Sequence, residues 1–258
     1  MNITFNKYQG AGNDFIIIDN RNGKINPSDP KLINKLCDRR FGIGADGLIL
    51  ISKESQSDFE MKYFNSDGYI GSMCGNGGRC TAHFALKSGI AGTKQRFLAF
   101  DGIHEAFVEK DIVHLQMSNV NEYKLIDDNY FINTGSPHYV IFKEDVDKVD
   151  VALEGKKIRW SSKFAPGGTN VNFVQVLDKG LYIRTFERGV EEETLACGTG
   201  VTASAIASVL KGHFDTNSVN VRARGGDLKV EFTIKDKVIA DVWLTGPATF
   251  VFEGKILI

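Results

Sequence analysis

Two cysteines in this chain stand at the start of matching glycine-rich turns. Around Cys74 the sequence reads FEMKYFNSDGYIGSMCGNGGRCTAHFALKSG, and around Cys197 it reads LYIRTFERGVEEETLACGTGVTASAIASVLKG. Cys74 lies ten residues after Phe64, and Cys197 lies eleven residues after Phe186. Two thiols supplied by equivalent halves of a duplicated protein can take a proton from one side of a carbon atom and return one to the other side. The sequence therefore predicts proton transfer by a pair of cysteines.

Each of these cysteines is expected at the N-terminus of a helix. The Ala-rich stretch after each Cys-Gly-x-Gly turn predicts the helix, and the first one is expected from about Gly77 to Lys87. Unpaired N–H groups and the positive end of the helix dipole lower the pKa of a thiol at that position towards neutrality. The glycines allow a ligand to approach the backbone, and the same N–H groups suit a carboxylate.

Other interpretations of the cysteines carry different weight. A single cysteine before glycine is more often a small buried residue, but two such turns in matching contexts favour function. Cys37 and Cys80 are expected in the core. Zinc is not expected, because zinc sites favour closely spaced Cys and His pairs, which the sequence lacks. A disulfide between Cys74 and Cys197 could form on oxidation, so a redox protein is a rival interpretation.

The composition is typical of a globular protein. At 258 residues the chain can bury a sizeable core, as one large domain or two of ordinary size. A net charge of −1 implies no bulk attraction to nucleic acid or to an anionic membrane. The start, MNITFNKYQGAGNDF, does not resemble a secretory signal, and no apolar run approaches the roughly 20 residues that span a bilayer. We therefore expect a cytoplasmic protein with reduced thiols.

Short apolar or alternating runs separated by turns dominate the rest of the chain, for example DFIIID, GLILIS and LKVEFT. This pattern predicts strands and hairpins. A third helix is predicted after Asp29, a residue that can cap it, with Pro30 at the first position. Its apolar stripe consists of Leu32, Ile33, Leu36 and Cys37. Many strands with one helix per repeat, and no regular βαβ alternation, favour an α+β fold.

The duplication also predicts how the chain is divided. The N-terminal half, residues 1–117, carries Cys74 and is expected to be completed by the C-terminal strand, residues 250–258. The C-terminal half, residues 118–249, carries Cys197. The segment 42–47 matches the GxGxxG pattern of dinucleotide-binding folds. It follows a predicted helix and precedes a predicted strand, which is the reverse of the order that such a site needs, so we expect a plain glycine-rich turn.

Several motifs together resemble those of the diaminopimelate epimerase family. They are MCGNGGRC, ACGTG, GAGNDFIIID, GIGADG, the pair Pro137-His138 and FERG. The resemblance covers essentially the whole chain. It implies a cofactor-independent enzyme that interconverts LL- and meso-diaminopimelate, on the route to lysine and the bacterial cell wall. It also implies two pseudo-symmetric domains, each with strands wrapped around a central helix, and an active site in the cleft between them.

The resemblance also implies roles for individual residues. Cys74 and Cys197 match the two catalytic cysteines, and His138 and Glu187 match a pair that assists proton transfer. The residues that match substrate contacts are Asn13, Asn65, Gly75, Asn76, Asn170, Glu187, Arg188, Gly198 and Thr199. Asn172 lies close enough to Asn170 to be confused with it. The implied partner is a small amino-acid substrate, with no metal, cofactor, nucleic acid or membrane, and a homodimer is compatible with the sequence.

Two positions depart from the family's pattern. A glutamine often follows the Asp of the GIGxD stretch, whereas this chain has Gly47 there. The family commonly shows Gly-Asn-Pro-His, whereas this chain has Ser136 in place of the Asn. These changes concern the contacts to the distal end of the substrate rather than the proton chemistry. The loop 189–196 is also slightly longer than in many relatives.

Two further functions stay open at this stage. Another two-cysteine racemase, acting on proline or hydroxyproline, would use the same chemistry. A thiol redox protein would cycle between dithiol and disulfide, but it would leave the carboxylate-binding motifs unexplained. A related isomerase fold that lacks the thiol pair is disfavoured by the two cysteines.

Overall fold

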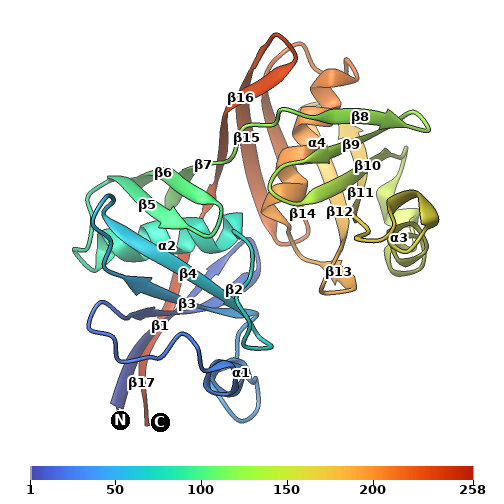
Figure 1. Ribbon diagram of the computed structural model, residues 1–258. Coiled ribbons are helices and arrows are strands. Elements are labelled where there is room, and N and C mark those ends of the chain that lie inside the picture. Colours follow the sequence, from blue (N-terminus) through green and yellow to red (C-terminus); the bar gives the residue numbers. More distant parts are fainter. Residues whose placement is uncertain (1, 258) are drawn as a thin grey trace. The chain divides into compact units, whose positions relative to one another are not determined.

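The computed structural model describes residues 2–257, which form two compact units (Figure 1). Unit 1 comprises the described residues up to Leu115 together with those from Gly246 onwards, and unit 2 comprises Gln116–Thr245. The chain leaves unit 1 at the end of β7 (Ile112–Gln116) and returns to it at the end of β16 (Val238–Pro247). Unit 2 is therefore continuous in sequence, whereas unit 1 is built from two segments.

Unit 1 contains a mixed sheet and two helices. Besides β7, its elements are β1 (Asn2–Gly10), β2 (Asn13–Asp19), α1 (Pro30–Cys37), β3 (Gly47–Ser52), β4 (Phe59–Asn65), α2 (Gly75–Lys87), β5 (Lys94–Ala99), β6 (Gly102–Glu109) and β17 (Thr249–Leu257). β17 pairs with β1 and β1 with β2, both antiparallel. β2 and β3 are parallel, β3 and β4 antiparallel, and β4 and β5 parallel. β5, β6 and β7 then form an antiparallel meander.

Unit 2 contains a second mixed sheet. Besides β16, its strands and helices are β8 (Tyr123–Ile126), β9 (Asn129–Asn133), β10 (Pro137–Phe142), α3 (Val151–Arg159), β11 (Asn170–Leu177), β12 (Gly180–Glu187), β13 (Glu192–Thr194), α4 (Gly198–Leu210), β14 (Ser218–Ala223) and β15 (Gly226–Lys235). Short 3₁₀ turns, η1 (Val146–Lys148) and η2 (Ser162–Phe164), flank α3.

The two units repeat one topology, which confirms the duplication. In unit 2, β8, β9 and β10 are antiparallel neighbours, β10 and β11 are parallel, and β11 and β12 are antiparallel. β12 is parallel to β14, and β14, β15 and β16 form an antiparallel meander. α2 lies between the parallel strands β4 and β5 in sequence, and α4 lies between β12 and β14 in the same way. The fold is therefore α+β, as predicted.

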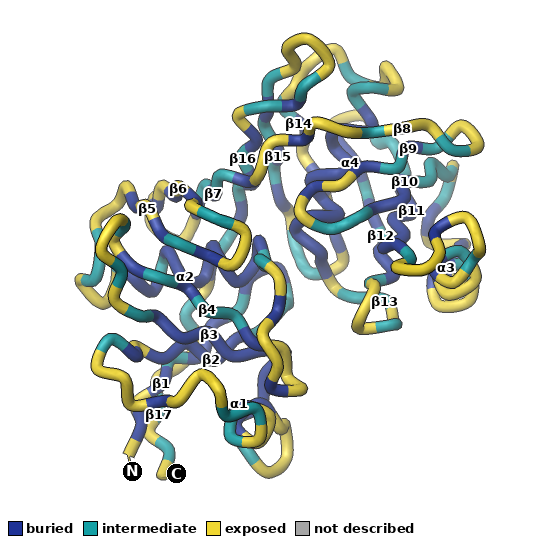
Figure 2. The backbone as a smooth tube through the Cα atoms, in the orientation of Figure 1, coloured by how far each residue is buried: buried dark blue, intermediate teal, exposed yellow. Residues whose placement is uncertain are grey.

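The central helix of each unit is buried on nearly all sides. α2 contacts β1, β2, β3, β4, β6 and β17, and α4 contacts β9, β10, β11, β12, β14 and β15. In α4 every residue from Gly198 to Ser208 is buried, which Figure 2 shows as a continuous dark-blue helix. A helix can be enclosed in this way only if it is apolar or small around its whole circumference, and the Ala-rich composition meets that condition. Strands therefore surround a central helix in each unit.

The predicted helix at Asp29 is confirmed, and one helix was not predicted. The Asp29 side chain accepts a hydrogen bond from the Leu32 N–H at 3.1 Å, with Pro30 in the first turn. α3 occupies the corresponding place in unit 2, and Asp150 caps it. Gly155 lies in the middle of α3, where a Cβ would be 2.4 Å from Cβ of Phe186. The close packing of α3 thus requires a residue that weakens the helical signal in the sequence.

None of the helices within residues 2–257 is long and apolar enough to cross a membrane. The segment 42–47 lies between α1 and β3 and is not followed by a helix, so the glycine-rich turn is as predicted. Gly47 begins β3, opposite Asn65 of β4. A Cβ at Gly47 would lie 2.4 Å from the ring of Tyr63. The tyrosine ring fills the space that a side chain at position 47 would need, which accounts for glycine there.

Candidate active site

Cys74 is the N-cap residue of α2, as the sequence predicted. Its backbone is extended, and its Sγ accepts a hydrogen bond from the Gly77 N–H at 3.4 Å. The side chain is partly exposed, unlike that of Cys80, six residues later, which is completely buried. Burial raises the pKa of Cys80 to about 12, and that of Cys37 to about 12 as well. Cys37 and Cys80 are therefore protonated core residues at neutral pH.

Asn13 lies against Cys74 with its amide held in one orientation. The Cys74 Sγ lies 3.6 Å from Asn13 Oδ1, and Asn13 Nδ2 donates to a carboxylate oxygen of Asp46 at 2.5 Å. Arg39 in turn donates to the other oxygen of Asp46 at 2.7 Å. A carboxylate only accepts hydrogen bonds, so the amide NH₂ must face Asp46 and the carbonyl oxygen must face the thiol. The sequence indicated Asn13 but gave no signal for Asp46.

A buried arginine supports the first turn of α2 from behind. Arg79 is 0% exposed. It donates to the Gly75 carbonyl at 3.3 Å and to Asn76 Oδ1 at 2.8 Å, and its Nε lies 3.5 Å from the Pro247 carbonyl oxygen. Desolvation lowers the pKa of this guanidinium. These bonds fix the backbone at Gly75 and the side chain of Asn76, which are two of the residues matched to substrate contacts.

Cys197 is the N-cap residue of α4 and is the counterpart of Cys74 in unit 2. Its Sγ lies 3.3 Å from the hydroxyl oxygen of Thr199. The Thr199 hydroxyl also lies 2.8 Å from His138 Nε2, and His138 Nδ1 lies 3.0 Å from the side-chain nitrogen of Asn172. A continuous polar chain therefore links the imidazole to the thiol. The Thr199 hydroxyl lies within contact distance of both His138 and Cys197.

His138 is neutral in the folded protein. The side chain is completely buried, and this burial, together with the positive charge of Arg188, lowers the pKa of the imidazole to about 3. At neutral pH the ring therefore carries one proton and can donate through one nitrogen and accept through the other.

This low pKa predicts a pH-dependent stability. The unfolded chain takes up a proton at His138 near pH 6.5 and the folded chain does not, so stability falls as pH decreases from 6.5 towards about 3. For each unit by which the pH decreases, the free energy of unfolding of wild type should therefore fall by up to about 1.4 kcal/mol more than that of His138→Gln. Urea unfolding between pH 6.5 and 5 measures this, above the range in which Asp14, with its pKa of about 2, contributes. Equal slopes for the two proteins would contradict a buried neutral His138, since all other groups are common to both.

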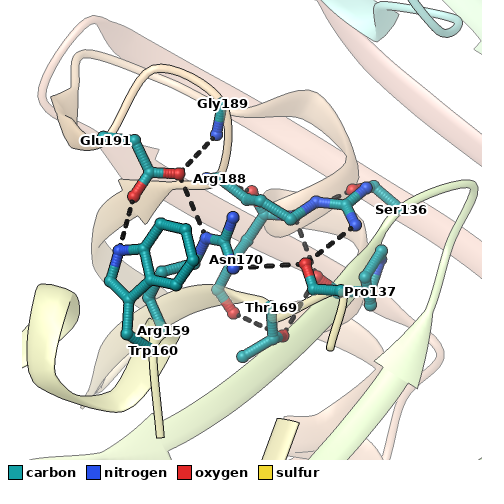
Figure 3. Close-up of polar contacts among 10 residues, drawn as sticks. Ser136, Pro137, Arg159, Trp160, Thr169, Asn170, Arg188, Gly189 and Glu191 are labelled. Carbon is teal, nitrogen blue, oxygen red and sulfur yellow. Dashed lines mark hydrogen bonds and ion pairs between the residues drawn. The ribbon is translucent and has the colours of Figure 1, made fainter. Parts of the chain in front are cut away.

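Glu187 and Arg188 lie where β12 ends. Glu187 accepts a hydrogen bond from the Thr194 hydroxyl at 3.0 Å. The backbone N–H of Arg188 donates to Asn170 Oδ1 at 2.8 Å, and the NH₂ of Asn170 donates to Ser136 Oγ and to the Pro137 carbonyl, both at 2.8 Å (Figure 3). The guanidinium of Arg188 is exposed. Asn170 thus fixes the backbone from which Arg188 projects, and it connects this backbone to Ser136.

The loop after Arg188 is held by one carboxylate. Glu191 accepts hydrogen bonds from the Gly189 N–H at 3.0 Å, from Arg159 Nε at 3.1 Å and from the Trp160 indole N–H at 3.1 Å (Figure 3). Glu191 itself has a φ of +62°. The loop therefore packs onto the end of α3, which gives it a defined shape.

The matched residues fall into two groups, one in each unit. Unit 1 holds Asn13, Asn65, Cys74, Gly75 and Asn76, and unit 2 holds His138, Asn170, Glu187, Arg188, Cys197, Gly198 and Thr199. Asn65, which is exposed, ends β4, and Glu187, which is half-buried, ends β12. No group of three or more His, Cys, Asp or Glu side chains within residues 2–257 is arranged to hold a metal ion. Sequence patterns gave no role to Asp46 or Arg79 and did not separate Asn172 from Asn170.

Comparisons with known proteins agree with these motifs. A family model described as diaminopimelate epimerase matches residues 5–120 and 130–251. A diaminopimelate epimerase of Flavobacterium psychrophilum is 50% identical over 252 residues, which cover 97% of this chain and 98% of that protein. A diaminopimelate epimerase of Aquifex aeolicus is 44% identical over an alignment of 273 positions, which covers 98% of this chain and 97% of that protein.

Solved structures of other enzymes share the fold. A phenazine biosynthesis protein of the PhzF family from Bacillus anthracis has a TM-score of 0.80 at 16% identity, with full coverage of both chains. A hydroxyproline epimerase from Agrobacterium vitis has a TM-score of 0.73 at 15% identity, covering 99% of this chain and 92% of the other. At such identities the likeness concerns the fold alone.

Proposed function

We propose that this chain, which belongs to the diaminopimelate epimerase family, inverts its substrate by passing a proton between the thiols of Cys74 and Cys197. The chain is accordingly an isomerase that interconverts LL- and meso-diaminopimelate in lysine biosynthesis. The observation that best supports the two-thiol scheme is the shared position of the cysteines. Each one occupies the N-cap position of a buried central helix at the same point of the repeated topology.

The chemistry has to overcome the low acidity of the α-proton. The neighbouring carboxylate opposes formation of a carbanion, so charge that develops in the transition state needs stabilisation. The N–H groups at the first turns of α2 and α4 are fixed donors that suit a carboxylate, and their dipoles need no reorganisation during the reaction. One thiolate removes the proton, the other thiol returns a proton to the opposite face, and the two roles exchange in the reverse reaction.

Recognition of the substrate requires the distal amino and carboxylate groups to be held as well. We assign a carboxylate to Arg188, whose planar fork can form two parallel hydrogen bonds. Asn13, Asn65 and Asn170 carry both donors and acceptors, which suits an amino acid. His138 supports Cys197 through Thr199, and Glu187 is the second assisting group.

The racemases that act on proline or hydroxyproline are not favoured for this chain. Curated relatives named diaminopimelate epimerase are 38–50% identical to it, most of them over nearly its full length. The hydroxyproline epimerase is 15% identical. We propose that the enzyme works in the cytoplasm, where thiols stay reduced.

A homodimer stays a prediction, which sedimentation tests: a single species of 28.5 kDa would contradict it.

Isotope exchange tests the function directly. Incubation with LL-diaminopimelate in heavy water under reducing conditions should yield meso-diaminopimelate with deuterium at the inverted α-carbon, read by mass spectrometry. Proline and hydroxyproline under the same conditions should gain no label. Exchange into either of these with none into diaminopimelate would favour the racemase alternative. A redox cycle without exchange into any amino acid would contradict the epimerase.

A further inference from the structure

A fully buried set of polar side chains lies behind Cys197 in unit 2. Asn172 and His138 are 0% exposed and Thr185 is 2% exposed. They come from three adjacent strands, since β10 pairs with β11 and Asn172 of β11 lies opposite Thr185 of β12. Burying polar groups is unfavourable unless every one is hydrogen-bonded. The hydrogen-bond partners of these groups therefore determine which atoms of the set carry protons.

The donor and the acceptor of each hydrogen bond in this set can be identified in turn. The Thr185 hydroxyl donates to Asn172 Oδ1 at 3.0 Å, so the NH₂ of the same amide is the group that lies 3.0 Å from His138 Nδ1. An amide NH₂ only donates, which makes Nδ1 of His138 an acceptor without a proton. The single proton of the neutral ring must then lie on Nε2.

The direction continues to the sulfur. His138 Nε2–H donates to the Thr199 hydroxyl oxygen at 2.8 Å. Because Nε2 already carries a proton, the Thr199 hydroxyl cannot donate to it. The hydroxyl proton is instead available to Cys197 Sγ, 3.3 Å away. A donor aimed at a sulfur atom favours the thiolate over the thiol.

The packing leaves little room for another arrangement. A Cβ at Gly200, in the first turn of α4, would lie 2.4 Å from Asn172 Oδ1 and 3.2 Å from His138 Cε1. The backbone of α4 therefore lies directly over the amide and the ring. This closeness restricts the positions of both side chains, and the hydrogen bonds then define which atoms face each other.

We propose that Asn172 and Thr185 are positioning residues that hold His138 in the Nε2–H tautomer, so that Thr199 directs its hydroxyl proton to the Cys197 sulfur. This inference rests on the proposed function and adds two residues to it. Neither residue is among those matched to catalytic or substrate contacts. Each acts only through His138 and Thr199.

Nitrogen NMR of the imidazole rings tests the tautomer without reference to activity. The sequence has five histidines, so the ring signals of protein labelled with ¹⁵N-histidine can be resolved, and His138→Gln identifies the signal of His138. Wild type at pH 7 should show a protonated Nε2 and an unprotonated Nδ1. In Asn172→Asp the carboxylate can only accept a hydrogen bond, so Nδ1 should gain the proton, either in the other neutral tautomer or in the imidazolium.

A matched pair of variants separates positioning from a structural role. Thr185→Val keeps the shape of the side chain and loses the hydroxyl that orients Asn172, whereas Thr185→Ser keeps the hydroxyl. Thr185→Val should give mixed tautomer signals and lower kcat/KM by roughly tenfold, as expected for the loss of one buried hydrogen bond. Thr185→Ser should show the tautomer signals and the kcat/KM of wild type. Thermal unfolding of each variant confirms that it is folded.

The outcomes are distinct from those of the isotope experiment. A protonated Nδ1 in wild type at pH 7 would overturn the inference, as would an unchanged His138 spectrum in Asn172→Asp. Both results would leave the epimerase intact if deuterium still enters diaminopimelate. If Asn172→Asp fails to fold, the wild-type spectrum and the two Thr185 variants still test whether His138 is held in the Nε2–H tautomer.

Discussion

Cys74→Ala and Cys197→Ala are each expected to abolish epimerisation. The scheme needs one thiolate to remove the α-proton and one thiol to return a proton, so the loss of either sulfur stops the cycle. A single general acid or base typically contributes roughly 10²–10⁴-fold to the rate. The measurement is conversion of LL- to meso-diaminopimelate by chiral chromatography.

Two further cysteine variants sharpen this test. Cys74→Ser and Cys197→Ser keep a protic group, but a hydroxyl is a far weaker acid and base, so only residual turnover is expected. Cys37→Ala removes a buried thiol whose pKa is raised to about 12, and it should leave kcat/KM unchanged while lowering stability. Substantial turnover by either alanine variant at position 74 or 197 would rule out the two-thiol scheme.

Arg188→Met is expected to lower kcat/KM by about 10²-fold. In the proposed function Arg188 forms two charge-assisted hydrogen bonds to a substrate carboxylate, each of the kind worth about 1.5–3 kcal/mol, and the variant cannot form them. Arg188→Lys keeps the charge and loses the fork, so roughly a tenfold loss is expected. Steady-state kinetics with LL-diaminopimelate measures both effects.

An exposed arginine in the same unit is the matched control. Arg222 on β14 is 65% exposed and its Nε lies 3.7 Å from an exposed carboxylate oxygen of Asp227, so Arg222→Met should change neither kcat nor KM. Equal kinetics for Arg188→Met and Arg222→Met would show that Arg188 does not bind the substrate.

Elements with strong local signals were predictable from the sequence. Asp29 and Pro30 mark the start of α1, and the glycine turns mark α2 and α4, because capping and small-residue composition act over a few neighbouring residues. α3 was missed, since Gly155 and three basic residues in its last turn conceal its apolar face. The duplication itself held the missing signal: α1 lies between the parallel strands β2 and β3, so a helix was due between β10 and β11.

The candidate site was predictable to the level of residue type and not to that of hydrogen-bond direction. Asn170 and Asn172 lie two residues apart on one strand, so their side chains project from the same face. Both side chains are buried, so only their hydrogen-bond partners distinguish them. Asn170 contacts the backbone of Arg188, and Asn172 contacts His138. Asp46 likewise contacts Asn13, which is 33 residues away in sequence, and no local pattern reports such a contact.

The pairing of β17 with β1 affects how the protein is made. β1 leaves the ribosome before unit 2, but β17, one of its two partner strands, is translated after all of unit 2. Unit 2 can therefore fold while synthesis continues, whereas unit 1 waits with an open strand edge that other chains could join. The half with Cys197 can thus mature before the half with Cys74. A nascent chain that stalls before Thr249 would be a substrate for chaperones or proteases, with its later-maturing half still incomplete.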